Sequence, residues 1–236
     1  MAKEKKQIGL MDAIRYAATL TQSVNVGVSL GKDSVCLLDL CVKNFMHVYP
    51  FFMYFVKELS FQENYIRYLE DRYQVGITRL PHWMLGTCYL GGLYRDTNFL
   101  TDTCPNIKPT DIEDYMTEET GTPWFAYGQM MCESIERNAM IKTVGEVDEE
   151  NKRIYALAEW NPKKVFQYLK NHGIQLAPEY RYAKRSIGDL RPENVAIIKE
   201  HFPDDYETIK RIFPYIEAKE RQHEFQKIRQ RASAST

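Results

Sequence analysis

Apolar residues in the first eighty positions follow two alternating spacings. Short runs rich in β-branched and aromatic residues have the character of buried strands, and longer segments place apolar residues at helical intervals. This alternation predicts an open, mostly parallel twisted sheet with helices on both faces, an α/β fold with Rossmann-like organisation. We expect strands at residues 24–28, 49–56 and 76–80, and helices at residues 10–23, 33–44 and 60–73, the last beginning in a capping box of Ser60 and Glu63.

The pattern changes after residue 80. Residues 81–123 are rich in glycine, proline, threonine and acidic side chains without clear periodicity, which indicates a lid, a binding loop or an insertion. Regular spacing then returns, and a C-terminal helical segment closes the chain. We expect a strand at 124–128, a helix at 129–142, a turn at 148–151, a helix from Pro162 to Gly173, and helices at 192–201, 204–213 and 215–231.

Composition restricts the class of protein. The chain has 236 residues and a formal net charge of -1, so it has no global attraction for nucleic acid. Its five cysteines include no Cys-x-x-Cys pair, which argues against disulfides, a zinc site or an iron–sulfur cluster. The sequence contains no apolar span of about 18 residues, the length that a membrane-spanning helix needs. We expect a cytoplasmic protein with no membrane association.

Candidate chemistry lies directly after the first expected strand. Residues 24–34 (Val-Asn-Val-Gly-Val-Ser-Leu-Gly-Lys-Asp-Ser) describe a strand, a glycine-bearing turn and a helix start. Backbone N–H groups converge at such a helix start, the helix dipole adds positive charge, and Lys32 adds a full positive charge. The expected ligand is a phosphate group.

The spacing separates two kinds of phosphate loop. A Walker loop needs four residues between its glycines and a hydroxyl residue after the lysine, whereas here three residues separate Gly27 from Gly31 and Asp33 follows the lysine. The segment instead resembles the PP-loop, Ser-Gly-Gly-x-Asp-Ser, of the ATP pyrophosphatase and PAPS reductase superfamily. Ser29, Gly31, Asp33 and Ser34 match that pattern, and Leu30 replaces its first glycine.

Three later segments resemble PAPS reductases more specifically. Residues 128–137 (Gly-Gln-Met-Met-Cys-Glu-Ser-Ile-Glu-Arg) are similar to the family's Gly-x-Arg-x-x-Glu/Asp/Gln-Ser-x-x-Arg, but lack its first arginine. Residues 156–169 are similar to its Pro-Leu-x-x-Trp-x-x-x-Asp-Val-Trp-x-Tyr segment. Tyr180 and residues 186–189 (Ser-Ile-Gly-Asp) match a further motif. The chain is thus identified as a PAPS reductase-like member of the PP-loop superfamily, with a nucleotide-binding domain at 1–190 and a helical extension at 191–236.

Site residues follow from the residue chemistry and from this resemblance. Lys32 and Arg137 offer cations to phosphate or sulfate oxygens, and Asp33 could hold Mg²⁺ that bridges ATP phosphates. These three are the candidate catalytic residues, and Asp33 is the candidate metal ligand. The candidate nucleotide-binding residues are Ser29, Gly31, Lys32, Ser34, Gly128, Gln129, Ser134, Ser186, Gly188 and Asp189.

Departures from the family bear on the reaction. PAPS reductases use a nucleophilic cysteine in a C-terminal Glu-Cys-Gly-x-His segment, and this sequence has no cysteine after Cys132. The family's Asp-Thr-Gly after the second strand is Val-Lys-Glu at residues 56–58. Sulfonucleotide reduction by a thiol of this chain alone is therefore not expected.

Three functions stay open. The preferred hypothesis is an ATP pyrophosphatase that uses ATP with Mg²⁺ to adenylate an acceptor, in sulfur metabolism or in sulfur transfer such as DNA phosphorothioation. The first alternative binds PAPS or APS and depends on an external thiol, or on Cys132 or Cys88. The second is a catalytically silent nucleotide-binding scaffold. The expected partners are an adenine nucleotide and a sulfur-donor or complex protein, with nucleic acid only indirectly; a homodimer is left open.

Overall fold

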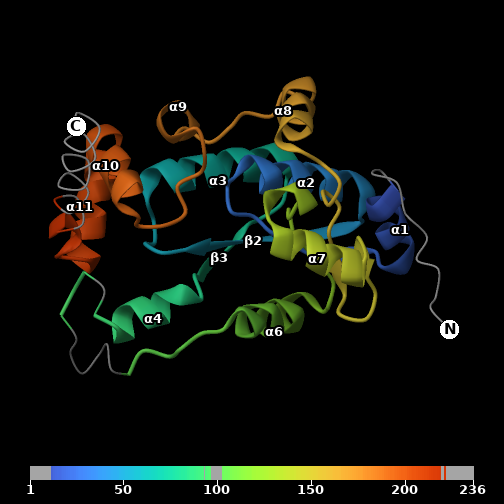
Figure 1. The fold of residues 1–236 in the computed structure, drawn as a ribbon, viewed down its shortest axis with the longest axis horizontal. Helices are drawn as coiled ribbons and strands as arrows, with labels where there is room; N and C mark the ends of the chain where they lie inside the picture. The colour runs from blue at the N-terminus through green and yellow to red at the C-terminus, as the bar shows by residue number, and fades with distance from the viewer. Residues whose placement is uncertain (1–11, 93, 97–102, 219–220, 222–236) are drawn as a thin grey trace, which may run out of the picture.

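The computed structural model describes residues 12–92, 94–96, 103–218 and 221 (Figure 1). Its centre is a six-stranded sheet in the order β3-β2-β1-β4-β6-β5. All neighbouring strands run parallel except β5, which is antiparallel to β6. This confirms the predicted α/β fold with a mostly parallel sheet. The strands are β1 Ser23–Gly27, β2 His47–Tyr54, β3 Thr78–Pro81, β4 Phe125–Ala126, β5 Val147–Asp148 and β6 Arg153–Ile154.

Strand β1 lies in the middle of the sheet and defines a crevice at its end. It pairs with β2 on one side, with Val26 opposite Pro50, and with β4 on the other side, with Val26 opposite Ala126. The chain leaves β1 through α2 (Lys32–Asn44) toward β2, so the strand order reverses between β1 and β4. In open α/β sheets, ligands bind beyond the carboxyl ends of the strands at such a reversal.

Helices cover both faces of the sheet (Figure 1). On one face, α2, α3 (Ser60–Tyr73) and α8 (Pro162–Asn171) pack over a core that includes Val24, Val26 and Leu37. On the other face, Phe51 and Phe125 pack against α6 (Pro109–Thr120). The remaining helices are α1 Asp12–Leu20, α4 Met84–Leu90, the 3-10 turn η1 Met131–Glu133, α7 Ile135–Val144, α9 Tyr180–Ala183, α10 Pro192–His201 and α11 Pro203–Ile212.

The C-terminal helices pack on the start of α3. Residues of α10 and α11 share an apolar cluster with Val56, Leu59 and Phe61. Asp205 on α11 accepts hydrogen bonds from the Ser60 N–H and hydroxyl, at 2.6 and 2.8 Å, and from the Phe61 N–H at 3.2 Å. A carboxylate from α11 therefore occupies the positive end of α3.

The predicted capping box of Ser60 and Glu63 is wrong. No side chain of the helix caps α3, whose N-cap is Leu59. Glu63 instead forms an ion pair with Arg79 on β3 at 3.0 Å. Local spacing could not reveal this, because Asp205 caps the helix from 145 residues away.

Two predicted segments differ from the structure. The stretch 81–123, which showed no clear periodicity, contains α4 and α6. In α6 only Ile112 and Met116 are buried, about one helical turn apart. Acidic residues surround these two positions, so the sequence showed no helical pattern. The helix expected at 129–142 begins only at Ile135, because the Ser134 side chain accepts a hydrogen bond from the Arg137 N–H and caps it there.

Other elements agree with their predictions. The turn at 148–151 joins β5 to β6, and α8 begins at Pro162 after Asn161, whose side chain accepts from the Lys164 N–H at 3.0 Å. Most of the helix expected at 215–231 lies outside the described residues. Within the described part of the chain, no helix combines the length and hydrophobicity needed to cross a membrane.

Candidate functional site

The loop that joins β1 to α2 keeps a glycine-like backbone although it carries a leucine. Leu30 has φ of +60°, a left-handed conformation that costs a non-glycine residue roughly 1–2 kcal/mol. Its side chain is only 2% exposed and belongs to the main core. The leucine side chain is therefore directed into the core and leaves the outer face of the loop to the backbone.

Ser34 braces this loop from within. Its hydroxyl accepts hydrogen bonds from the Ser29 N–H at 3.1 Å and the Ser29 hydroxyl at 3.2 Å, and donates to the Gly31 carbonyl at 3.0 Å. Gly31 is the N-cap of α2, and no side chain caps the helix there. The first turn of α2 thus presents N–H groups and the positive end of the helix dipole at the end of β1.

Lys32 and Asp33 lie side by side on this first turn. The Lys32 ammonium is 2.5 Å from Asp33 Oδ2. Asp33 Oδ1 is buried and has no hydrogen-bond partner. Burial raises the pKa of Asp33, the neighbouring lysine opposes this rise, and the nearby Glu133 carboxylate adds to it. Mg²⁺ sites use one or two carboxylates together with phosphate oxygens and water, and the Oδ1 of Asp33 can serve as one such ligand.

A distant segment completes the loop. The Tyr180 hydroxyl accepts a hydrogen bond from the Lys32 N–H at 2.8 Å, which leaves its own proton free to donate. Burial raises the pKa of Tyr180, so this hydroxyl keeps its proton at neutral pH. The Ser186 hydroxyl lies beside Gly31, where a Cβ would approach it to 3.1 Å. Sequence analysis matched Tyr180 to a family motif without assigning it to the site, since only the fold brings it to Lys32.

The segment after β4 meets the loop at Gly128. A Cβ at this position would lie 3.1 to 3.2 Å from backbone atoms of Asp33 and Ser34, which is tighter than most Cβ contacts, so glycine favours this close approach. Gln129 follows, half-buried, and then Met130 turns into the core. The structure therefore brings Gly128 together with the residues of the first loop.

Beyond Gly128 the segment is held by its own residues. The Arg137 guanidinium forms an ion pair with Glu133, and Glu133 also accepts from the Met130 N–H at 3.1 Å. Arg137 is 43% exposed. Glu133, which sequence analysis did not assign to the site, is close enough to Asp33 to influence its titration. Ser134 caps α7, and the ion pair directs the Arg137 side chain to Glu133.

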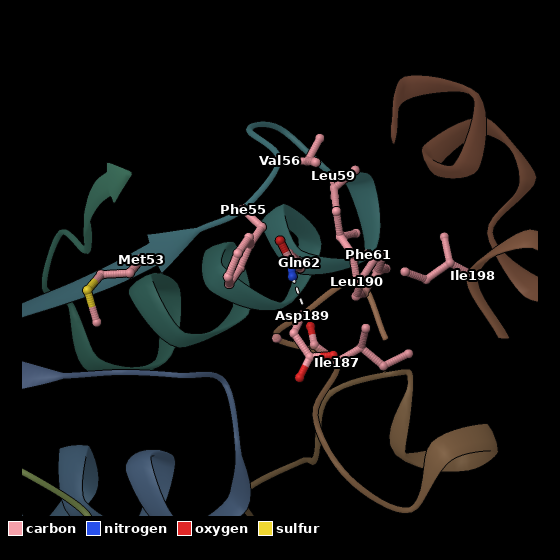
Figure 2. Close-up of a pocket in the computed structure, with 11 residues that line it drawn as sticks. Met53, Phe55, Val56, Leu59, Phe61, Gln62, Ile187, Asp189, Leu190 and Ile198 are labelled. Carbon is pink, nitrogen blue, oxygen red and sulfur yellow. Dashed lines mark hydrogen bonds between the residues drawn. The ribbon is translucent and has the colours of Figure 1, made fainter. Parts of the chain in front are cut away.

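Gly188 and Asp189 lie at a separate small cavity (Figure 2). Asp189 accepts hydrogen bonds from the Arg191 side chain, at 2.8 and 3.0 Å, and from Asn194 at 2.6 Å. Burial opposes ionisation, but these hydrogen bonds outweigh it and lower the pKa of Asp189. The cavity of about 20 Å³ has room for roughly one water molecule and none for a nucleotide. Gln62 donates to the Ile187 carbonyl at 3.1 Å and closes one wall.

The predicted residues thus fall into three groups. Ser29, Gly31, Lys32, Asp33, Ser34, Gly128 and Ser186 surround the start of α2. Gln129, Ser134 and Arg137 belong to the segment after β4. Gly188 and Asp189 line the small cavity. The first group combines amides, a cation, hydroxyl donors and a carboxylate, a set that can bind a phosphate chain together with a metal ion.

Comparison with known proteins identifies the family of the chain. Residues 23–193 match the model of the phosphoadenosine phosphosulfate reductase domain. No curated protein matches the chain. Among solved structures, the phosphoadenylyl-sulfate (PAPS) reductase from Candida auris, in a phosphate complex, superimposes with a TM-score of 0.53 at 16% identity, over 77% of this chain and 88% of the other.

Two further structures are similar at lower scores. The U34-tRNA thiolase NcsA from Methanococcus maripaludis, with its [4Fe-4S] cluster, has a TM-score of 0.45 and 12% identity, over 87% of this chain and 78% of the other. The NH3-dependent NAD synthetase from Campylobacter jejuni has a TM-score of 0.46 and 10% identity, over 92% of both chains. The family model covers all six strands of the sheet and the whole loop at the end of β1. The chain therefore belongs to the phosphoadenosine phosphosulfate reductase domain family, within the PP-loop superfamily.

Proposed function

We propose that the protein binds ATP with Mg²⁺ at the start of α2 and transfers its adenylyl group to an acceptor. The observation that supports this proposal is the free Oδ1 of Asp33 beside the anion-binding helix end. Asp33 pairs with Lys32 through Oδ2, and its Oδ1 would be available to a divalent cation that arrives with a triphosphate.

Each residue of the loop would have a separate task. The amides at the start of α2 and the Lys32 ammonium would bind phosphate oxygens, and the Tyr180 hydroxyl would donate its free proton to one of them. Asp33 would hold Mg²⁺, which supplies positive charge that neutralises the leaving pyrophosphate. Catalysis would consist mainly of positioning and charge stabilisation.

The reaction is a substitution at the α-phosphorus. A nucleophilic atom of the acceptor forms a bond to this phosphorus, and the bond to the oxygen that bridges the α- and β-phosphates breaks. The electron pair leaves with pyrophosphate, the acceptor proton passes to solvent, and AMP remains attached to the acceptor. With water as acceptor, the products are AMP and pyrophosphate.

Product analysis tests this proposal. The protein is incubated with α-labelled ATP and Mg²⁺, alone and with sulfur-donor and nucleic-acid acceptors, and we expect AMP or an AMP adduct with equimolar pyrophosphate. Lys32→Ala should abolish turnover, and Lys57→Ala, at a lysine that is 63% exposed, should leave it unchanged. Formation of ADP and orthophosphate, or no turnover with any acceptor, would contradict the proposal.

The family match supports a second candidate, a protein that binds PAPS or APS. The matched family model carries the PAPS reductase name, and Cys132 is an exposed thiol on the segment after β4. Thermal denaturation with ATP, PAPS and APS, each with and without Mg²⁺, separates the two functions, because only a ligand of the folded state raises the melting temperature. Stabilisation by PAPS or APS without Mg²⁺, and none by ATP, would favour this second candidate.

A further inference from the structure

A groove lies on the helical face, and its lining residues differ from those of the small cavity at Asp189. It has a volume of about 900 Å³ and lies between α3, α8 and residues 174–181. At Asn64 and Tyr68 it continues into a shallow hollow along α3. In Figure 1, α8 and α9 stand on either side of this region above α3. The groove is large and open enough to accept an extended chain.

Aromatic side chains line this groove. Phe166 on α8 is 42% exposed, although its neighbours Val165 and Leu169 are buried. Across the groove, the rings of Tyr65 and Tyr68 stack with centroids 5.6 Å apart. The Tyr68 hydroxyl accepts from the Gln175 N–H at 3.0 Å, which fixes the ring at the groove wall. Fixed aromatic rings at a groove surface provide platforms on which planar bases stack.

The charges along the groove and its hollow are mainly positive and uncompensated. Arg67, Arg72, Lys170 and Arg181 line them, against the single acidic residue Asp71. Among the described residues, none of these four cations forms an ion pair; Arg72 donates instead to the carbonyls of His172 and Gly173 at the end of α8. A chain whose formal net charge is -1 therefore concentrates unpaired positive charge here.

The groove reaches the candidate active site at one end. Phe166 lines it, and the Lys32 ammonium lies 5.9 Å from the centre of its ring. Tyr180 also lines it and contacts the Lys32 N–H. A chain that occupies the groove would place one end beside the loop of residues 28–34.

We propose that this groove binds a single-stranded nucleic acid, with the backbone phosphates on the cations and bases stacked on Phe166 and Tyr68. Cations interleaved with aromatic rings are the combination that single-strand-binding proteins use. An acidic peptide would need the cations but not an exposed aromatic ring. This inference does not depend on the proposed reaction, although it would supply that reaction with an acceptor.

Fluorescence anisotropy with a labelled oligothymidine of about 12 nucleotides tests the proposal on the full chain, without nucleotide or turnover. We expect micromolar binding at 50 mM salt. The charge reversal Lys170→Glu/Arg181→Glu should weaken binding at least tenfold. It should also make the slope of log K against log salt concentration shallower by roughly 1 to 1.5, since each lost phosphate contact contributes about 0.7 to that slope. Phe166→Ala should weaken it about tenfold with little change in salt dependence.

Controls separate this surface from general charge. The matched double variant Arg15→Glu/Lys142→Glu changes exposed cations on α1 and α7 outside the groove and should bind as the unmodified chain does. Thermal melting establishes that each variant is folded. The proposal would be overturned if the oligonucleotide did not bind up to about 100 μM, or if the control variant lost as much affinity as the groove variant. It would also be overturned if decaglutamate bound with the same affinity and Phe166→Ala had no effect. The last result would assign the groove to an acidic peptide.

Discussion

The loop after β1 and the segment after β4 meet at Gly128 but are held in opposite ways. The loop is braced by Ser34 from within and by Tyr180 and Ser186 from a distant part of the chain. The segment is held by local bonds, with Arg137 paired to Glu133 four residues away. The proposed function therefore predicts that the loop keeps its conformation when a nucleotide binds, whereas Arg137 has to leave Glu133 to reach a phosphate.

The strongest expected effect tests the loop. Asp33→Asn keeps the size of the side chain but removes the charge that would hold Mg²⁺. We expect turnover with ATP to fall roughly 10²–10³-fold, the range for losing one preorganised electrostatic group, with nucleotide binding in the absence of metal unchanged or tighter. Steady-state kinetics over a range of Mg²⁺ concentrations measure this. The control Asp114→Asn alters an exposed carboxylate on α6, and equal losses in both variants would contradict a metal role for Asp33.

The next effect concerns the support behind the loop. Glu179 is 1% exposed, its Oε1 accepts from the Ile187 N–H at 3.4 Å, and its Oε2 has no partner. Burial raises the pKa of Glu179 from 4.5 to about 7. The carboxyl group of Glu179 loses its proton near pH 4.5 in the unfolded chain and near pH 7 in the folded chain. Its contribution to the free energy of unfolding is therefore fully present below pH 4.5 and is lost as the pH rises to 7.

Glu179→Gln should remove that decline. At about 1.4 kcal/mol per pH unit, the unmodified protein should lose up to roughly 3 kcal/mol relative to the variant between pH 4.5 and pH 7. Urea unfolding of both proteins across this range measures the difference. If the free energy of unfolding had the same pH dependence in both proteins, the pKa of Glu179 would not differ between the folded and unfolded chains, contrary to what its burial implies.

A smaller effect measures the strain in the loop. Leu30→Gly restores the residue of the family pattern and relieves roughly 1–2 kcal/mol of backbone strain, but it removes a buried leucine side chain worth roughly 2–5 kcal/mol. We expect a net loss of about 1–3 kcal/mol in unfolding free energy. Leu30→Ala loses a similar side chain and keeps the strain, so it should be less stable than Leu30→Gly by about 1 kcal/mol. Equal stability of the two variants would show that the left-handed backbone carries no cost here.

The smallest effect is expected in the segment after β4. Arg137→Ala should weaken nucleotide binding about tenfold or less, because its charge must leave Glu133 before it reaches a phosphate. The melting temperature should change little, since Arg137 is 43% exposed. Isothermal titration with ATP measures the effect, with Lys142→Ala on the same helix as control. A loss as large as that of Asp33→Asn would mean that the two regions are equally preorganised.

Much of the fold was predictable from local patterns. The β1–α2–β2–α3–β3 order, the hairpin of β5 and β6 and the start of α8 at Pro162 follow from short-range periodicity and turn residues. The start of α7 was misplaced by six residues, because Ser134 as a helix cap competes with a continuous helical pattern that begins at Gln129. The helix α6 was missed because its buried face consists of two residues only.

The sequence by itself determined the local form of the loop, since Ser29, Gly31, Lys32, Asp33 and Ser34 lie within six residues of one strand-turn-helix segment. It also determined the family to which the chain belongs. Only the tertiary structure decided that Tyr180 contacts Lys32, that Asp205 caps α3, and that cations of α3, α8 and α9 line one groove and its hollow. These contacts join residues far apart in the chain, and their positions depend on how the helices pack on the sheet.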